Sequence, residues 1–259
     1  MTTQRIVGYG DFNCPWSYLA SRRATMLAAE GVEVEWRGVE HEPWQPRRMM
    51  DSSLRFTALR EEIERVRAVL LPGEELPFSP SGFVPYTKAS ISGYAEAYGA
   101  GVGAAVGRAL FEAFWQRGVD LGDAKVVRRL LADAIVSGSS RSELLSDWGY
   151  AVDVTGGPVT STAWRLIEQW REQWRGTGKE VVPILVVDGA APVFGVEAVT
   201  WLGDELTRRG VDVGHMPPGE SEGDPRTDLA SLSWVSQHGN RWLRDYQRAH
   251  REPIPQHAS

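Results

Sequence analysis

The stretch DFNCPWSYLA (residues 11–20) holds the one cysteine of the chain, Cys14, with the hydroxyl of Ser17 three residues later. Two cysteines at this spacing are typical of a redox-active turn; here a serine replaces the second. Pro15 suits the first turn of a helix, so we expect Cys14 at a helix N-terminus. The free N–H groups and the helix dipole favour an anion there and lower a thiol pKa. With a hydrogen bond from Ser17, the pattern predicts a nucleophilic thiolate at Cys14.

A plainer interpretation stands beside this one, because a lone cysteine near an apolar run is usually a small buried hydrophobic residue. Pro15 and Trp16 next to the cysteine favour the reactive thiol, with Trp16 shielding one face of the sulfur or packing in the core. Ser17 could equally be a helix-start residue that bonds only to the backbone.

A second motif, Val182-Pro183, stands just before the strand-like run ILVVDG. Proline cannot donate to a strand ladder, so its place at the head of a central strand is unusual. A cis peptide at a turn facing the cysteine would accommodate Pro183. The N–H and C=O of Val182 could then pair with an extended substrate, as an added strand would.

The elements that must position these motifs begin with a strand, a helix and a strand, at residues 5–12, 15–31 and 32–40. Apolar residues alternate in the strands and recur every three or four positions in the helix, which predicts a βαβ unit. The pattern is helical from about residue 44 to 176. Gly103 and Gly107, one helical turn apart, would let two helices approach closely.

Individual helices in this long segment are marked by their apolar periodicity. The run LRFTALREEIERVRAVLL places Leu59, Ile63, Val66 and Leu70 on one face. The run TSTAWRLIEQWREQW predicts a helix with Trp164, Ile167 and Trp174 on one face. The run GAGVGAAVG lacks the G-x-G-x-x-G spacing of a dinucleotide loop and follows no strand, which favours helix packing over cofactor binding.

Strand character returns at residues 180–189 and 191–196, joined by a hairpin-like Asp188-Gly189 turn, and a helix follows. The segment at residues 211–259 begins with a linker rich in Pro and Gly. An amphipathic helix could follow it and serve as a dimer element.

The composition of the chain argues against some classes of function and indicates where the protein works. The 259 residues carry a net charge of −6 and show no long basic stripe, which argues against dedicated nucleic-acid binding. One cysteine excludes an internal disulfide and favours a reducing compartment. Without a signal-like start or a membrane-length apolar run, we expect a cytoplasmic protein.

The five histidines show no metal-ligand spacing, so we expect no metal site. His41 and Glu42 follow the second strand. They could reach the site, with His41 acting as a base, or simply stand in a solvent-exposed loop.

The order of these elements, with Cys14-Pro15-Trp16 at a helix start and Val182-Pro183 before a strand, resembles the DsbA-like branch of the thioredoxin superfamily. This branch includes FrnE-like oxidoreductases, kappa-class glutathione transferases and 2-hydroxychromene-2-carboxylate isomerases. The resemblance covers about residues 5–209. It implies an α/β, thioredoxin-like fold with a large inserted helical domain.

The resemblance also implies a division of the chain and a set of site residues. Residues 1–43 and 177–210 would form the discontinuous thioredoxin-like domain, residues 44–176 the helical insertion, and residues 211–259 the linker and terminal helix. Cys14 would be the reactive thiol and Pro183 the cis-proline, with the active-site cleft between the two domains.

Two positions depart from the relatives. Dithiol members carry a resolving cysteine where this chain has Ser17, whereas transferases and isomerases usually carry a serine where it has Cys14. In the latter group a Gly-Ser-Asp-like turn grips glutathione; the equivalent run here keeps a carboxylate at Glu197 and lacks the hydroxyl.

Three functions follow as hypotheses. The leading one is a thiol-disulfide oxidoreductase that uses Cys14 and Ser17, docks its partner through Pro15, Trp16, Val182, Pro183 and Glu197, and needs an external thiol to complete turnover. The second is a glutathione- or mycothiol-dependent isomerase or transferase. The third is a non-catalytic binding module. We expect no tightly bound cofactor, a small thiol or disulfide as partner, and a possible homodimer.

Overall fold

The computed structural model describes residues 4–41, 52–78, 83–138 and 150–214. The predicted terminal helix and Glu42 lie outside these ranges, so the expectations placed on them stay predictions.

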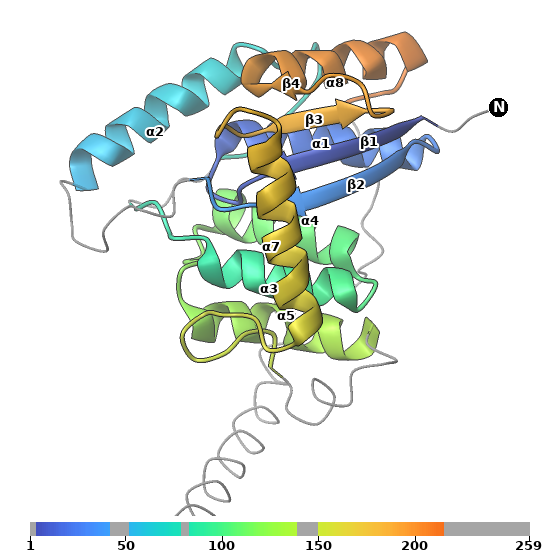
Figure 1. The fold of residues 1–259 in the computed structure, drawn as a ribbon. Coiled ribbons are helices and arrows are strands. Elements are labelled where there is room, and N and C mark those ends of the chain that lie inside the picture. The colour runs from blue at the N-terminus through green and yellow to red at the C-terminus, as the bar shows by residue number, and fades with distance from the viewer. Residues whose placement is uncertain (1–3, 42–51, 79–82, 139–149, 215–259) are drawn as a thin grey trace, which may run out of the picture.

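A four-stranded mixed sheet forms the centre of the protein, in the order β2-β1-β3-β4 (Figure 1). β1 pairs in parallel with β2 and antiparallel with β3, and β3 pairs antiparallel with β4. The predicted hairpin is present, and both turn residues have positive φ, 49° at Asp188 and 73° at Gly189. The strand bounds are β1 Arg5–Gly10, β2 Glu33–Gly38, β3 Ile184–Val187 and β4 Val193–Phe194.

Helices cover the sheet in two groups, which confirms the α/β class. α3, α4 and α5 form a layer on one side, α7 runs from that layer to the sheet, and α8 and α2 lie on the other side (Figure 1). α2 packs on α1 and lies on the same side of the sheet as α8, although the proposed division of the chain groups it with the helical insertion. The bounds are α1 Pro15–Ala29, α2 Ser52–Arg67, α3 Lys88–Gly99, α4 Gly103–Arg117, α5 Ala124–Gly138, α7 Ser161–Gly176 and α8 Gly195–Arg209.

The buried face of α7 differs from the predicted one. Trp164 is 53% exposed, whereas Trp170 and Trp174 are 1% and 2% exposed. Ten residues separate Trp164 from Trp174, which turns the two side chains roughly 80° apart around the helix. The prediction that Trp164 shares the buried face is therefore wrong, and Trp170 takes its place.

The predicted close approach at Gly103 and Gly107 is confirmed. A Cβ atom at Gly107 would lie 3.0 Å from Cε2 of Tyr94, and one at Gly103 would lie 3.1 Å from Cα of Tyr98. The N-terminal turns of α4 therefore pass α3 at a distance that side chains at these positions would increase.

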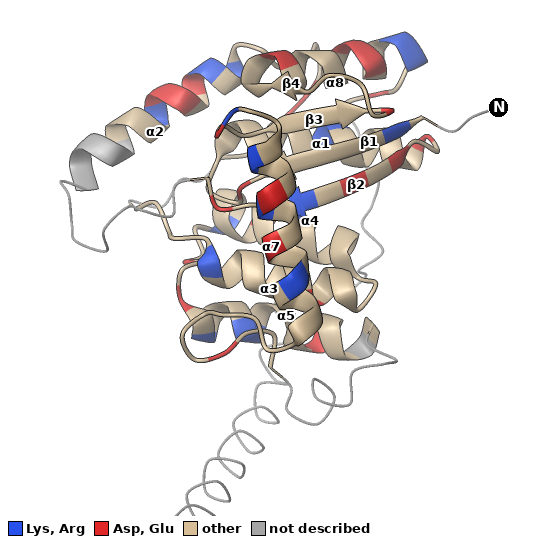
Figure 2. Ribbon diagram, viewed as in Figure 1, with Lys and Arg blue, Asp and Glu red and all other residues tan. Residues whose placement is uncertain are grey.

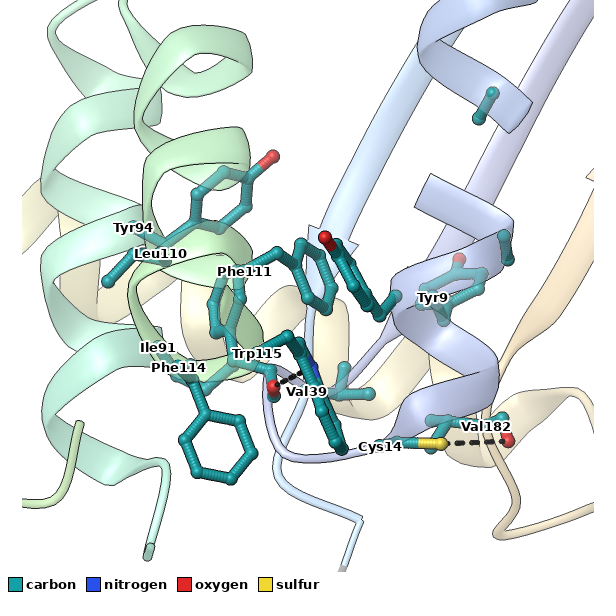
Figure 3. Packing of buried hydrophobic residues seen from close by; sticks show 14 of the residues in the cluster. Tyr9, Cys14, Val39, Ile91, Tyr94, Leu110, Phe111, Phe114, Trp115 and Val182 are labelled. Carbon is teal, nitrogen blue, oxygen red and sulfur yellow. Dashed lines mark hydrogen bonds between the residues drawn. The ribbon is translucent and has the colours of Figure 1, made fainter. Parts of the chain in front are cut away.

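The helical layer also holds the loop after β1. The indole Nε1–H of the buried Trp115 in α4 donates to the carbonyl of Phe12 at 3.0 Å (Figure 3). Asn13 Nδ2 donates to the carbonyl of Pro85 at 3.1 Å. Because buried peptide groups need partners, these two bonds fix the residues that lead into α1.

On the other side of α1, a buried ion pair joins three segments. Arg23, 1% exposed, donates to both carboxylate oxygens of Glu74 and to the carbonyls of Val69 and Val199. These bonds tie α1 to the segment after α2 and to α8. Four of the five guanidinium N–H donors thereby have an acceptor, which offsets much of the cost of burying the charge.

Both signs of charge alternate along α2, α7 and α8 (Figure 2). In the described part of the chain, no helix combines the length and the apolar character that crossing a bilayer requires.

Candidate functional site

Cys14 occupies the N-cap position of α1, as the sequence predicts, with φ −95° and ψ 122°. Its N–H donates to the carbonyl of Asp11 at 3.2 Å, which closes the turn after β1. Its carbonyl accepts the N–H of Tyr18 at 3.0 Å, which starts the helix. The backbone N–H of Ser17, in the first turn of α1, acts on the Cys14 sulfur.

The cis peptide predicted at Val182-Pro183 is present. The Cys14 thiol donates to the carbonyl oxygen of Val182, with Sγ 3.8 Å from that oxygen (Figure 3). β1 and β3 place the two segments together, because Tyr9 pairs with Ile184 across the antiparallel ladder. Residues following β1 then meet residues preceding β3.

The protonation state of the thiol differs from the expected one. Cys14 is 7% exposed, and burial raises its pKa to about 12, because a thiolate loses more hydration on burial than a thiol. The negative charges of Glu62 and Asp11 raise the pKa further. The prediction of a lowered pKa is therefore wrong for this state of the protein: desolvation outweighs the helix terminus.

Ser17 lowers the pKa of Cys14 through its backbone N–H and its hydroxyl, although less than burial raises it. The side chain is fully buried, and its Oγ accepts the N–H of Asp11 at 3.3 Å. Both roles considered for Ser17 are therefore present: its hydroxyl bonds to the backbone of Asp11, and Ser17 also stabilises the sulfur anion of Cys14. Pro15 is buried at the first position of α1, and Trp16 is half-buried against the core.

The remaining predicted residues border this centre. Val182 is 8% exposed, and its N–H makes no hydrogen bond to any residue of the described ranges. Glu197 is exposed in the first turn of α8, whose first residue, Gly195, donates its N–H to the carbonyl of Pro183 at 2.8 Å. The start of α8 is therefore adjacent to the cis-proline, two residues from Glu197.

Sequence reasoning missed Asp11 and left the role of His41 open. Asp11 is 1% exposed, and its Oδ2 lies 2.8 Å from Nδ1 of His41 and accepts the His41 N–H at 3.1 Å. Its other oxygen, Oδ1, has no hydrogen-bond partner among the described residues. The neighbouring Glu40 has a raised pKa, first because of burial and then because of the Asp11 charge.

A sequence signal for this pair exists. β1 and β2 are parallel, and Gly10 pairs with Gly38, so the residues after both strands meet at one edge of the sheet. An acidic residue directly after β1 and a histidine shortly after β2 would be expected there. The site thus combines a buried thiol, a cis-proline and an Asp11–His41 pair.

Three solved structures resemble the chain in fold. The first is a 2-hydroxychromene-2-carboxylate isomerase, with 18% identity and a TM-score of 0.54, and the match covers 80% of this chain and 96% of that one. The second is a probable DsbA oxidoreductase from Streptomyces coelicolor, with 19% identity and a TM-score of 0.53 over 86% of this chain and 94% of that one. The third is the cytosolic disulfide reductase DsbM from Pseudomonas aeruginosa, with 16% identity and a TM-score of 0.52 over 79% of this chain and 99% of that one. A further structure of that DsbM contains glutathione (16%, 0.50, 80% and 100%). A search of curated proteins finds no match.

The family model of the DSBA-like thioredoxin domain matches residues 5–155, more than half of the chain. The match contains β1, the Cys14 turn, α1 and most of the helical layer. This chain therefore belongs to the DSBA-like thioredoxin domain family.

Proposed function

We propose that the protein is a thiol-disulfide oxidoreductase in which Cys14 is the single reactive sulfur. The observation that carries the proposal is the contact of the Cys14 thiol with the carbonyl of Val182, next to the cis-proline. The N–H of Val182, which has no hydrogen-bond partner among the described residues, offers a donor to an extended substrate, as in strand addition. Pro15, Trp16 and Glu197 border the same place and would contact the partner.

The proposed reaction consists of two successive thiol-disulfide exchanges. The Cys14 thiolate attacks one sulfur of a disulfide R–S–S–R′, a Cys14–S–R bond forms, and R′S⁻ leaves and takes a proton. Because Ser17 cannot supply a second sulfur, an external thiol attacks the mixed disulfide and releases Cys14 as a thiolate. Glutathione or mycothiol would serve as this external thiol, and neither needs to be tightly bound.

The first exchange requires loss of the Cys14 proton, which burial opposes in the resting state. Substrate binding must therefore favour the thiolate. Ser17 and the N–H groups of α1 already lie where they can stabilise the anion. Protonated His41 would offset the charge of Asp11, which otherwise raises the Cys14 pKa.

A second function is favoured by the raised pKa of Cys14. A neutral thiol at a helix N-terminus can donate a hydrogen bond to the thiolate of a bound cofactor thiol such as glutathione. That is the arrangement a glutathione- or mycothiol-dependent isomerase or transferase would use, and it needs no covalent step at Cys14. The third possibility, a non-catalytic binding module, predicts neither adduct nor turnover.

One experiment separates these functions. The full chain at about pH 8.5 is incubated with glutathione disulfide, mycothiol disulfide or an oxidised dithiol peptide, and intact mass is measured. We expect one adduct per chain, at Cys14, that reduced thiol removes, and none in Cys14→Ser. No adduct with any probe would contradict the oxidoreductase.

The isomerase or transferase is tested with the same variants. If Cys14 only donates a hydrogen bond, Cys14→Ser keeps thiol-dependent turnover and Cys14→Ala loses it. If Cys14 forms a covalent bond, both variants lose turnover. Ser21→Ala, one helical turn beyond Ser17, is the matched control for substitution within α1.

Three further assignments belong to this proposal. A single cysteine suits the reducing environment of a cytoplasm. The thioredoxin-like domain would comprise residues 1–43 and 177–210, with the helical domain inserted between them. A homodimer through residues 211–259 would be tested by the mass of the protein in solution.

A further inference from the structure

The cis-proline loop, residues 177–183, is held by hydrogen bonds from three separate elements. The carbonyl of Val181 accepts the indole Nε1–H of Trp174 in α7 at 2.9 Å. The carbonyl of Val182 accepts the Cys14 thiol (Figure 3), and that of Pro183 accepts the first N–H of α8 at 2.8 Å. Three consecutive carbonyls are therefore bonded to α7, to the turn before α1 and to α8.

Trp174 stands near the end of α7, and its side chain belongs to the core. The residue is 2% exposed, so its indole N–H is shielded from water and needs an acceptor inside the protein. Its backbone carbonyl accepts the hydroxyl of Thr177 at 2.6 Å, which closes the end of the helix. Seven residues separate Trp174 from Val181. The indole bond therefore folds the cis-proline loop back onto the last turns of α7.

The carbonyl of Val181 and the N–H of Val182 belong to one peptide group. Among the described residues, the cis peptide bond is the next one, Val182-Pro183, so this group is trans. In a trans peptide the six atoms lie in one plane, and the C=O and the N–H point in opposite directions. The bond from Trp174 therefore fixes this plane and directs the N–H of Val182 away from the indole.

The N–H of Val182 has no hydrogen-bond partner among the described residues. Backbone N–H groups rarely stay without a partner, so this one is available to water or to a bound chain. A hydrogen bond accepted by the carbonyl of a peptide group also polarises that group and strengthens the bond that its N–H donates. Trp174 therefore both orients and strengthens this donor.

We propose that Trp174 is a positioning residue for docking, which presents the N–H of Val182 to an extended disulfide partner. This inference rests on the proposed function and adds α7 to the site. Trp115 of α4 holds the Cys14 turn through the carbonyl of Phe12. The two indoles thus hold the two loops of the site separately. A partner without an amide group beside its disulfide cannot use the Val182 donor and should be insensitive to Trp174.

The test compares two disulfides in adduct formation with the full chain at about pH 8.5. One is the symmetric disulfide of a short extended peptide that carries a single cysteine. The other is bis(2-hydroxyethyl) disulfide, which has no amide group. Trp174→Phe removes the indole donor and keeps an aromatic ring in the core. We expect the second-order rate constant to fall about three- to tenfold for the peptide disulfide, which is the effect of one hydrogen bond, and less than about twofold for the other.

Trp170→Phe is the matched control on the same helix. Trp170 is 1% exposed and lies four residues before Trp174. Its ring contacts Tyr94 and Tyr98, and within the described residues its indole bonds to no carbonyl of the cis-proline loop. This variant also loses core packing, but the ratio of its two rate constants should stay at the wild-type value. An equal loss with both disulfides in Trp174→Phe would indicate a structural role alone and overturn the proposal.

A second variant covers the case in which Trp174→Phe does not fold. Replacing Trp174 by 3-benzothienylalanine keeps the shape of the side chain without its N–H, and the same selective loss is expected. Alkylation of Cys14 by iodoacetamide needs no docking, so its rate should change less than about twofold in either variant. A larger change would mean that the substitution reaches the thiol itself, and it would overturn the proposal.

The inference and the proposed function fail in different ways. No adduct with either disulfide in the wild type would overturn the oxidoreductase, and this inference with it. Adducts in the wild type together with an unchanged ratio of rate constants in the Trp174 variants would overturn the role of Trp174 alone.

Discussion

The Cys14 thiol donates to the carbonyl oxygen of Val182 at 3.8 Å, across a gap of 168 residues in the sequence. The bond requires the proton to be on the sulfur, which agrees with the raised pKa of the buried thiol. The same carbonyl belongs to the cis peptide that would dock a substrate. Ionisation of Cys14 would therefore remove the donor of this hydrogen bond.

The first prediction concerns the reactivity of Cys14. Because its pKa is raised to about 12, alkylation by iodoacetamide in the native state should be slow near pH about 7. The rate should rise about tenfold per pH unit without a plateau below pH about 10, whereas unfolded protein should level off near the ordinary pKa of about 8.5. Mass spectrometry measures both rates. A native plateau below pH about 8 would show that the thiol is not desolvated.

The same shift predicts how stability depends on pH. The folded state holds the Cys14 proton more tightly than the unfolded chain does. The contribution of Cys14 to stability is therefore complete below pH about 8.5 and is lost as the pH rises toward about 12. The free energy of unfolding in urea is measured for the wild type and for Cys14→Ala between pH about 7 and 10. Its decrease with pH should be larger in the wild type, by the contribution of Cys14.

A third prediction isolates the charge of Asp11. Asp11→Asn removes one negative charge close to Cys14, so the thiol pKa should fall and alkylation at pH about 8 should become a few-fold faster. Asp204→Asn, an exposed change on α8, is the matched control and should have no effect. A slower rate in Asp11→Asn would mean that the carboxylate instead assists removal of the Cys14 proton.

A fourth prediction tests the bond between the helical layer and the Cys14 loop. Trp115→Phe leaves the carbonyl of Phe12 without its donor and opens a gap in the core. We expect a loss of about 2–4 kcal/mol in the free energy of unfolding and faster alkylation of Cys14. Trp164→Phe, at a side chain that is 53% exposed, should change stability by less than about 0.5 kcal/mol. Equal losses in the two variants would contradict the assignment.

A fifth prediction concerns the buried ion pair of Arg23 and Glu74. Arg23→Met would leave the Glu74 carboxylate buried without its partner and should cost about 3–5 kcal/mol of unfolding free energy. The double variant with Glu74→Leu should recover a large part of this loss, because two apolar side chains can replace a buried pair. Additive losses would show that the two side chains are not coupled and that each acts through its other hydrogen bonds.

The strands, the helices and the cis-proline follow from local patterns in the sequence. Alternation at β1 and β2 and the hairpin turn at Asp188-Gly189 are each set by neighbouring residues. The unusual place of Pro183 also pointed to its conformation. The face of α7 was misjudged because a ten-residue spacing does not return to the same side of a helix, whereas the four-residue spacing of Trp170 and Trp174 does.

The sequence alone determined the fold class, the position of Cys14 at a helix N-terminus and the absence of a second sulfur, since these depend on residue type and local spacing. The tertiary structure decided the protonation of that sulfur and the pairing of Asp11 with His41. Each of these depends on how much water neighbouring segments exclude and on which groups meet across long sequence separations. Local periodicity carries no information about either.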